Sequence, residues 1–221
     1  MRNGQLQREY LRYGLTSFED EEVLEFLLSI QFDSLDHRRE AQEFIHKYGS
    51  LNNVIDSAAN GNGNHDLSLK EYQLGLRLPH DLATRYLRNR VTESPLLGSP
   101  QVVIDYLSHS MNGLKVEHFK VLYLNGRNGL IHDEDISKGT VGHTAVYPRE
   151  VVRSALEYQA SGLIFAHNHS SGNPQPSEDD IEMTKKLRAA ASLFDITVHD
   201  HIIVAGGKYY SFSEKGMLEK G

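Results

Sequence analysis

Apolar side chains recur with different spacings in the two halves of the chain. Before residue 92 they recur with the spacing of amphipathic helices. One such stripe follows the acidic residues 19–22, and another ends at Gly49, a typical C-terminal stop for a helix. Pro79 marks the expected start of a last helix, because proline is favoured in a first turn. We therefore expect residues 1–91 to form a small helical domain.

Beyond residue 100, short apolar runs of strand length alternate with helical stripes. Helices are expected to begin at Pro100 and Pro148. Hairpin turns and crossover connections occur together, so we predict an α/β domain over residues 101–221 whose mixed sheet is flanked by helices. Residues 92–100 are rich in proline, glycine and serine and form the predicted linker. The expected strands cover residues 117–124, 130–131, 163–166, 196–204 and 209–212.

One segment of the second half gathers side chains that bind divalent metals. His167 and His169 follow an apolar run, and alternate residues of an extended segment point the same way, so both imidazoles can face one ion. A loop then leads to Ser177 and Asp180, whose Ser-x-x-Asp spacing is typical of a helix N-terminus. A catalytic zinc takes three nitrogen or oxygen ligands and keeps a fourth position for water. The hypothesis is that His167, His169 and Asp180 bind Zn²⁺, with the Ser177 hydroxyl aimed at the same site.

Each part of this pattern also has an ordinary explanation. With 12 histidines in 221 residues, roughly 0.65 His-x-His pairs are expected by chance, and His199 and His201 form a second pair. That second pair lies in a segment with the pattern of a strand, which buried, hydrogen-bonded histidines explain at least as well as metal binding does. Ser177 and Asp180 alone are explained by helix capping. The order of the parts (strand, two histidines, loop, helix start) favours the metal hypothesis.

The spacing His-x-His, seven residues, Ser, two residues, Asp resembles the metal motif of the JAB/MPN (JAMM) metalloproteases. The surrounding sequence is similar to the bacterial RadC family, strongly over residues 99–221 and more loosely over residues 1–90. Residues 167–172 read His-Asn-His-Ser-Ser-Gly, and Ser170 stands where that family has proline. The resemblance implies a cytidine-deaminase-like mixed sheet preceded by a helix-hairpin-helix-like domain. Further matching stretches are Gly139-Thr140, Pro148-Arg149-Glu150 and residues 200–203 and 210–212.

The resemblance also implies a catalytic glutamate at the head of the first strand, where Glu117 stands. Glu117 would be the general base that takes a proton from the attacking water, and Ser177 would donate a hydrogen bond to the developing oxyanion. Glu134 is the alternative base, but its acidic triplet, residues 133–135, has the composition of a solvated turn. Asp200 and His201 would lie next to the metal ligands and orient them by hydrogen bonds, without binding the metal themselves. The implied reaction is hydrolysis of a peptide or isopeptide bond.

The charge balance bears on a second hypothesis, DNA binding through residues 1–91 as part of repair or recombination. Residues 1–98 hold 11 Lys and Arg against 15 Asp and Glu, and residues 99–221 hold 12 against 15, which gives the net charge of −7. Neither half has the basic footprint of a nucleic-acid binder. Where a glycine hairpin would be expected, residues 75–80 read Gly-Leu-Arg-Leu-Pro-His, which offers few backbone N–H groups to a phosphate.

A third hypothesis is a catalytically silent MPN scaffold that binds partners. The presence of all five predicted site residues argues against it. The absence of cysteine leaves nitrogen and oxygen as metal ligands and suits a reducing compartment. No signal peptide and no apolar run of transmembrane length stand out, so we expect a cytoplasmic protein without a membrane partner. The sequence does not specify the oligomeric state or the substrate.

Overall fold

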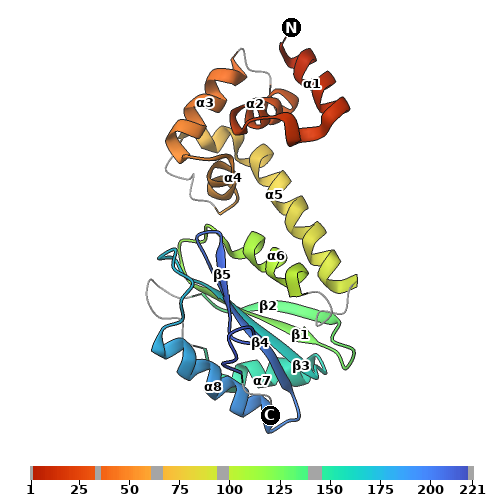
Figure 1. The fold of residues 1–221 in the computed structure, drawn as a ribbon, viewed down its shortest axis with the longest axis vertical. Helices are drawn as coiled ribbons and strands as arrows, with labels where there is room; N and C mark the ends of the chain where they lie inside the picture. The colour runs from red at the N-terminus through yellow and green to blue at the C-terminus, as the bar shows by residue number, and fades with distance from the viewer. Residues whose placement is uncertain (1, 33–35, 61–66, 94–99, 139–145, 219–221) are drawn as a thin grey trace. The chain divides into compact units, whose positions relative to one another are not determined.

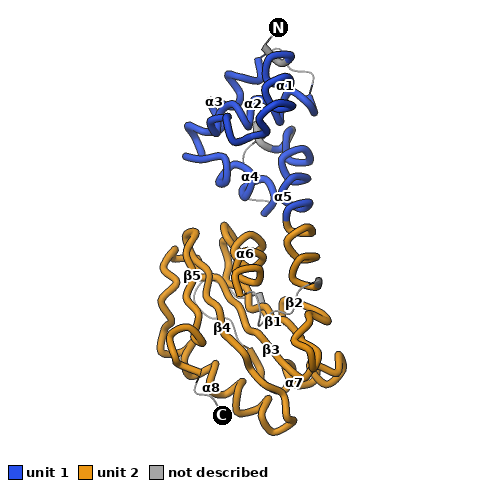
Figure 2. The backbone as a smooth tube through the Cα atoms, turned by 45° about the vertical axis from the view of Figure 1, so that its right-hand side comes forward, with its two compact units in different colours: residues 1–83 blue, residues 84–221 orange. Residues whose placement is uncertain are grey.

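The computed structural model describes residues 2–32, 36–60, 67–93, 100–138 and 146–218 (Figure 1). The chain divides into two compact units, residues 1–83 and residues 84–221 (Figure 2). The division falls within a single helix, α5 (Leu67–Glu93), so the first half of this helix belongs to one unit and its end to the other. Residues 94–99 of the predicted linker lie outside the described residues.

The first unit is helical, as the apolar spacing predicts. Its core gathers buried side chains from four helices, including Leu24, Phe44 and Val54. Glu19 caps the second helix through a capping box, and Gly49 ends the third helix with a φ of 86°, as expected for a left-handed C-terminal stop. The elements are α1 (Arg2–Tyr13), the 3-10 helix η1 (Gly14–Ser17), α2 (Asp20–Gln31), α3 (His37–Tyr48), α4 (Leu51–Ala59) and the first part of α5.

The prediction that Pro79 starts a helix is wrong, because this proline lies inside α5. Proline lacks an amide hydrogen and its ring crowds the carbonyl four residues earlier, so an interior position weakens a helix. Tertiary packing compensates at both ends of α5. Leu76 is fully buried in the core of the first unit, and Val91 is fully buried in the core of the second. Residues 75–80 are therefore helical and form no glycine hairpin, so DNA binding by this region stays a prediction.

The second unit contains a five-stranded mixed sheet, which confirms the predicted fold class. The strand order is β2-β1-β3-β4-β5, in which β3 and β4 are parallel and the other neighbours are antiparallel. Helix α8 makes the crossover between the two parallel strands. The strands are β1 (His118–Leu124), β2 (Leu130–Lys138), β3 (Gly162–Asn168), β4 (Thr197–Ala205) and β5 (Lys208–Ser211), and the helices are α6 (Pro100–Met111), α7 (Pro148–Glu157) and α8 (Glu178–Ser192).

Different helices cover the two faces of the sheet (Figure 1). Alternate residues of a strand point to opposite faces. Leu122 and Ile164 pack with the buried side chains of α6 on one face, while Val121 and Phe165 pack with those of α7 and α8 on the other. Because both faces of β3 are covered, all its residues are buried, which explains why it reads as a continuous apolar run.

The prediction that residues 133–135 form a solvated turn is wrong, because they lie within β2. The side chain of Asp133 is only 6% exposed and accepts hydrogen bonds from Arg88 Nε at 2.7 Å and from the Tyr106 hydroxyl at 2.5 Å. Burial opposes ionisation of Asp133, but the bonds from Tyr106 and Arg88 outweigh it and lower its pKa. The acidic triplet was misread because its partners, on α5 and α6, are distant in sequence.

Asp133→Ala is expected to lower the free energy of unfolding by about 3 kcal/mol, since it strands Arg88 and the buried Tyr106 hydroxyl. The pKa of Asp133 is lowered in the folded chain, so its stabilising effect is present above the unfolded pKa near 4 and lost as the pH falls further. Urea unfolding followed by circular dichroism measures the loss. Glu43→Ala, which breaks an exposed pair with Arg39, is the control and should leave the midpoint nearly unchanged.

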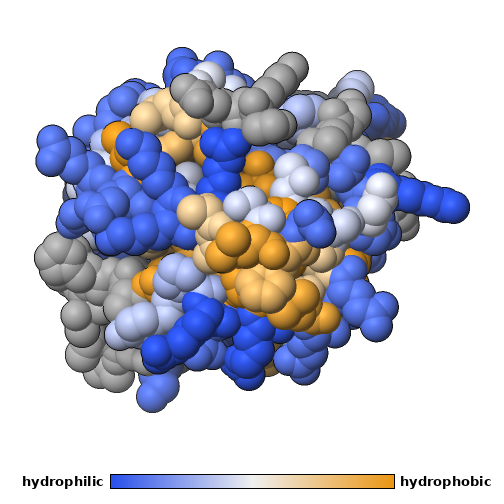
Figure 3. All heavy atoms as spheres, turned by 90° about the horizontal axis from the view of Figure 1, so that it is seen from below, coloured by the Kyte–Doolittle hydropathy of each residue, from blue (hydrophilic) through white to orange (hydrophobic). Residues whose placement is uncertain are grey.

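Seen from below, the surface shows apolar side chains grouped among hydrophilic ones (Figure 3). Leu156, at the end of α7, and Leu193 and Phe194, directly after α8, are each half exposed or more. Leu193 and Phe194 follow the end of α8 opposite to Asp180, so the rise of a helix places Leu193 roughly 20 Å from Asp180. Within the described ranges, none of the helices combines the length and apolar character that a bilayer crossing requires.

Candidate metal centre

The predicted metal ligands lie at the end of β3 and the start of α8. His167 is the sixth residue of β3, paired with Phe119 on β1 and Ile203 on β4, and its ring is buried. His169 follows the strand, and its backbone N–H donates to the carbonyl of Val204 at 3.0 Å. This bond continues the sheet pairing past the end of β3. Both imidazoles therefore point to the same side, as the alternation of an extended segment predicts.

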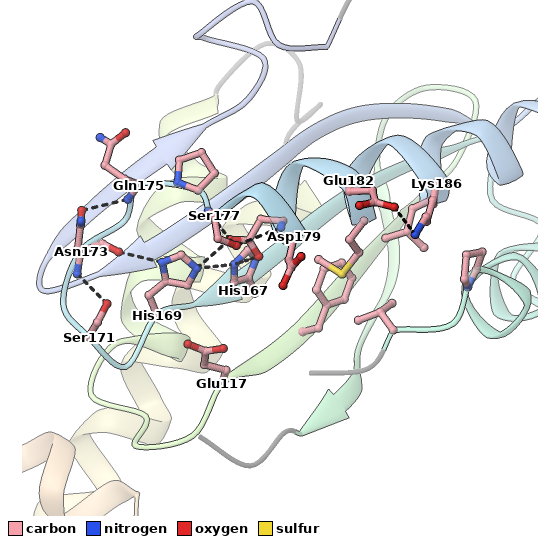
Figure 4. Close-up of a pocket in the computed structure, with 17 residues that line it drawn as sticks. Glu117, His167, His169, Ser171, Asn173, Gln175, Ser177, Asp179, Glu182 and Lys186 are labelled. Carbon is pink, nitrogen blue, oxygen red and sulfur yellow. Dashed lines mark hydrogen bonds and ion pairs between the residues drawn. The ribbon is translucent and has the colours of Figure 1, made fainter. Parts of the chain in front are cut away.

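The two histidines and Asp180 converge on one point (Figure 4). Nε2 of His167 lies 2.9 Å from Nε2 of His169 and 3.1 Å from Oδ1 of Asp180, and Nε2 of His169 lies 3.3 Å from Oδ2 of Asp180. Ligands about 2.0–2.1 Å from a tetrahedral zinc would be about 3.3 Å apart. Two imidazole nitrogens and one carboxylate in this arrangement fit a catalytic zinc site. Within the described part of the chain, these residues form the only such group of potential ligands.

Ser177 and Asp180 form a reciprocal cap at the start of α8, as the Ser-x-x-Asp spacing predicts. The Ser177 hydroxyl accepts from the backbone N–H of Asp180 at 3.2 Å and donates to Asp180 Oδ2 at 2.6 Å. The backbone N–H of Ser177 donates to the same oxygen at 2.8 Å. This cap fixes the direction of the Asp180 carboxylate. The same contacts therefore both cap helix α8 and orient the Asp180 carboxylate towards the two histidines.

The electrostatics of the cluster keep Asp180 ionised. Burial alone would raise its pKa, but hydrogen bonds from His167, His169 and Ser177 outweigh burial and hold the pKa of Asp180 well below its usual range. The bond to Asp180 in turn raises the pKa of His169, against the opposing effect of burial. The ionised carboxylate of Asp180 therefore faces the space between the three side chains, and a negative charge there favours the binding of a cation.

A cavity of about 760 Å³ opens beside the cluster. Glu117 lines it, in the segment just before β1, and in Figure 4 its carboxylate lies below the ring of His169. Glu134, the alternative general base, does not line this cavity. It lies in β2, where its carboxylate accepts from the buried Tyr123 hydroxyl at 2.8 Å. The geometry thus brings Glu117, and not Glu134, to the cavity that the two histidines share.

The structure separates the two residues predicted to support the ligands. His201 is fully buried, and its Nε2 lies 2.8 Å from Nδ1 of His167. Burial holds the pKa of His201 well below its usual value. The carboxylate of Asp200 instead accepts from the Ser211 hydroxyl at 2.6 Å and from backbone N–H groups of His201 and Ser213. These contacts join β4 to the segment around the end of β5 and do not involve a ligand ring.

Sequence reasoning missed the part played by Asn168, between the two histidines. Its side chain is turned to the opposite side of the strand and is 3% exposed. Its amide oxygen accepts from the backbone N–H of His118 at 2.8 Å, and its amide nitrogen donates to the carbonyl of Val116 at 3.1 Å. These bonds hold the backbone on both sides of Glu117. A polar residue inside a buried strand was the available signal, because such a residue needs hydrogen-bond partners.

Comparison with known proteins identifies one family. Residues 97–217 match the RadC-like JAB domain. A UPF0758 protein of Rhodobacter capsulatus is 36% identical over 217 residues, which cover 96% of this chain and the whole of the relative. A UPF0758 protein of Pseudoalteromonas translucida is 39% identical over 223 residues, covering 98% and 97% of the two chains. A third, from Herminiimonas arsenicoxydans, is 36% identical and covers 94% and 93%. None of these names describes an activity.

Proposed function

Because the chain belongs to the family of proteins with a RadC-like JAB domain, we propose that it is a zinc-dependent metallohydrolase that cleaves peptide or isopeptide bonds. The observation that carries this proposal is the convergence of two imidazole nitrogens and a carboxylate, within 3.3 Å, on the wall of a cavity. His167, His169 and Asp180 would hold the ion. Zinc bound there would supply a Lewis acid that lowers the pKa of water and polarises a carbonyl.

Glu117 would act as the proton carrier of the reaction. Its carboxylate lines the same cavity, on the side of His169. A general base must come within hydrogen-bond reach of the proton that it removes, and the place of Glu117 in the lining of the same cavity supports that role. Glu117 would take the proton from the attacking water and pass it to the leaving amine. The bonds from Asn168 to the neighbouring backbone would keep the carboxylate in place.

The walls of the cavity favour a peptide with an apolar side chain near the bond that is cleaved. Its lining includes the apolar side chains of Phe119, Met183 and Leu187 and the polar side chains of Asn173 and Gln175. Apolar surface removed from water stabilises a complex, and a few polar groups fix the orientation of a ligand. An extended peptide would place its carbonyl at the cluster, one side chain against these apolar residues and its backbone amides within reach of the polar ones.

Ser177→Ala is expected to lower the rate of hydrolysis by about 10²–10³, because the hydroxyl beside the cluster would no longer donate to the developing oxyanion. The loss of the helix cap should add a destabilisation of about 1 kcal/mol. The Ser177 hydroxyl donates its single proton to Asp180 in the structure and would turn towards the oxyanion in the transition state, so rates are compared at saturating zinc. Ser177→Thr keeps the hydroxyl and serves as the matched control. A full rate in Ser177→Ala, with the metal bound, would contradict this role.

The direct test of the proposal uses the chain loaded with zinc and a peptide library derived from a whole proteome. Mass spectrometry of newly formed amino termini detects any cleavage, and isopeptide-linked conjugates are assayed in parallel. New amines should form with the loaded chain, disappear after chelation and return when zinc is restored. A loaded chain that cleaves neither class of substrate would sink the hydrolase proposal and leave a scaffold or a nucleic-acid role.

A further inference from the structure

A chain of buried hydrogen bonds runs behind the candidate ligands and takes no part in the mechanism above. Nδ1 of His167 lies 2.8 Å from Nε2 of His201. Nδ1 of His201 lies 2.6 Å from the Thr184 hydroxyl, which lies 2.6 Å from the backbone carbonyl of Asp180. Thr184 is 2% exposed and His201 is fully buried, so water does not compete for these bonds. This series of hydrogen bonds begins at the ring of His167, one predicted ligand, and ends on the backbone carbonyl of Asp180, another.

The direction of the bonds follows from counting protons. A carbonyl only accepts, so the Thr184 hydroxyl donates its single proton to Asp180, and its oxygen then accepts from Nδ1–H of His201. The opposite direction would leave two oxygens 2.6 Å apart with no proton between them. A neutral imidazole carries one N–H, which leaves Nε2 of His201 as an acceptor. Nδ1–H of His167 therefore donates to it, and Nε2 of His167, which faces His169 and Asp180, is the nitrogen that would bind the ion.

We propose that Thr184 and His201 are positioning residues that hold His167 in the tautomer able to bind zinc and that tie its ring to the first turn of α8. The inference rests on the proposed zinc site. A metal-bound histidine usually donates its other N–H to a fixed acceptor, which sets the tautomer and the angle of the ring. Here the acceptor is a second imidazole, which needs a partner of its own to expose the correct nitrogen. Thr184 is that partner.

Thr184→Val tests the chain at its least disruptive point. Valine has nearly the same shape, but it lacks the hydroxyl, so Nδ1–H of His201 would remain buried without an acceptor. His201 can relieve this by adopting the other tautomer, which turns an N–H towards His167 and reverses the chain. We expect zinc affinity, measured at neutral pH by competition with a chromophoric chelator, to fall by about 10–100-fold. Thr184→Ser keeps the hydroxyl and should restore affinity to nearly that of the parent.

The tautomers themselves are measured in the parent chain, independently of the variants. Long-range proton–nitrogen spectra of the metal-free protein with ¹⁵N-labelled histidine distinguish a protonated ring nitrogen from a bare one. A protonated Nδ1 in both His167 and His201, together with a bare Nε2 in His201, is expected. A protonated Nε2 in His201 facing a bare Nδ1 in His167 would overturn the inference.

Two outcomes separate the inference from the function on which it rests. If the parent chain binds zinc and Thr184→Val binds it equally well, the positioning role is wrong and the zinc site stands. If the parent chain binds no zinc, the proposed function fails and the role of Thr184 towards the metal fails with it. Equal loss of affinity in the valine and serine variants would show that packing at position 184 matters and the hydroxyl does not, which also overturns the inference.

Discussion

His167→Ala is expected to abolish zinc binding, from about one zinc per chain to none. Nε2 of His167 lies within 3.1 Å of the other two donor groups, so its removal leaves two protein ligands for an ion that needs at least three. Zinc in a four-ligand site is bound with about 10–16 kcal/mol, so the loss of one ligand should lower affinity by more than about a hundredfold. Elemental analysis of protein purified without chelators or a metal-affinity tag measures the stoichiometry.

The matched control is His46→Ala, which removes an exposed histidine from the last turn of α3. It should leave the zinc content unchanged, whereas His169→Ala and Asp180→Ala should repeat the loss seen with His167→Ala. One zinc per chain in the parent and in all three ligand variants would mean that the metal is held elsewhere. That outcome would overturn the assignment of the centre and, with it, the proposed chemistry.

Local patterns predicted that His167, His169 and Asp180 lie together, because most of the geometry of this cluster is local. His167 and His169 are two positions apart on one extended segment, and Ser177 and Asp180 are three apart on one helix start. Strand alternation and helix capping fix the direction of each side chain before any long-range contact forms. The sequence order of strand, loop and helix then brings the two halves together. The same reasoning predicted the mixed sheet and the helices on its faces.

Contacts between distant segments could not be predicted from such patterns. Asp133 looked like part of a solvated turn because Arg88 and Tyr106, which neutralise and bury it, lie 45 and 27 residues away. Pro79 looked like a helix start because the packing that carries α5 through it comes from two separate cores. Thr184 gave no signal at all, since a threonine inside a helix is ordinary until His201 is seen beside it.

Glu117→Gln is expected to lower the rate of hydrolysis by about 10²–10⁴ while the chain keeps one zinc. Glutamine has the shape of glutamate and can still hydrogen-bond to water, but it cannot accept and return a proton. The change therefore isolates proton transfer from substrate binding, and kcat should fall much more than KM rises. The substrates are the peptides or isopeptide conjugates that the parent chain cleaves.

Glu134→Gln is the matched control for this prediction, since Glu134 is the alternative candidate for the general base. Its carboxylate accepts a hydrogen bond from the Tyr123 hydroxyl, and the amide oxygen of glutamine preserves that contact. This variant should keep the parental rate. If instead Glu134→Gln were inactive and Glu117→Gln fully active, the proton carrier would lie outside the cavity that His167, His169 and Asp180 share. That result would be hard to reconcile with any reaction at this centre, because a base must reach the water that it activates.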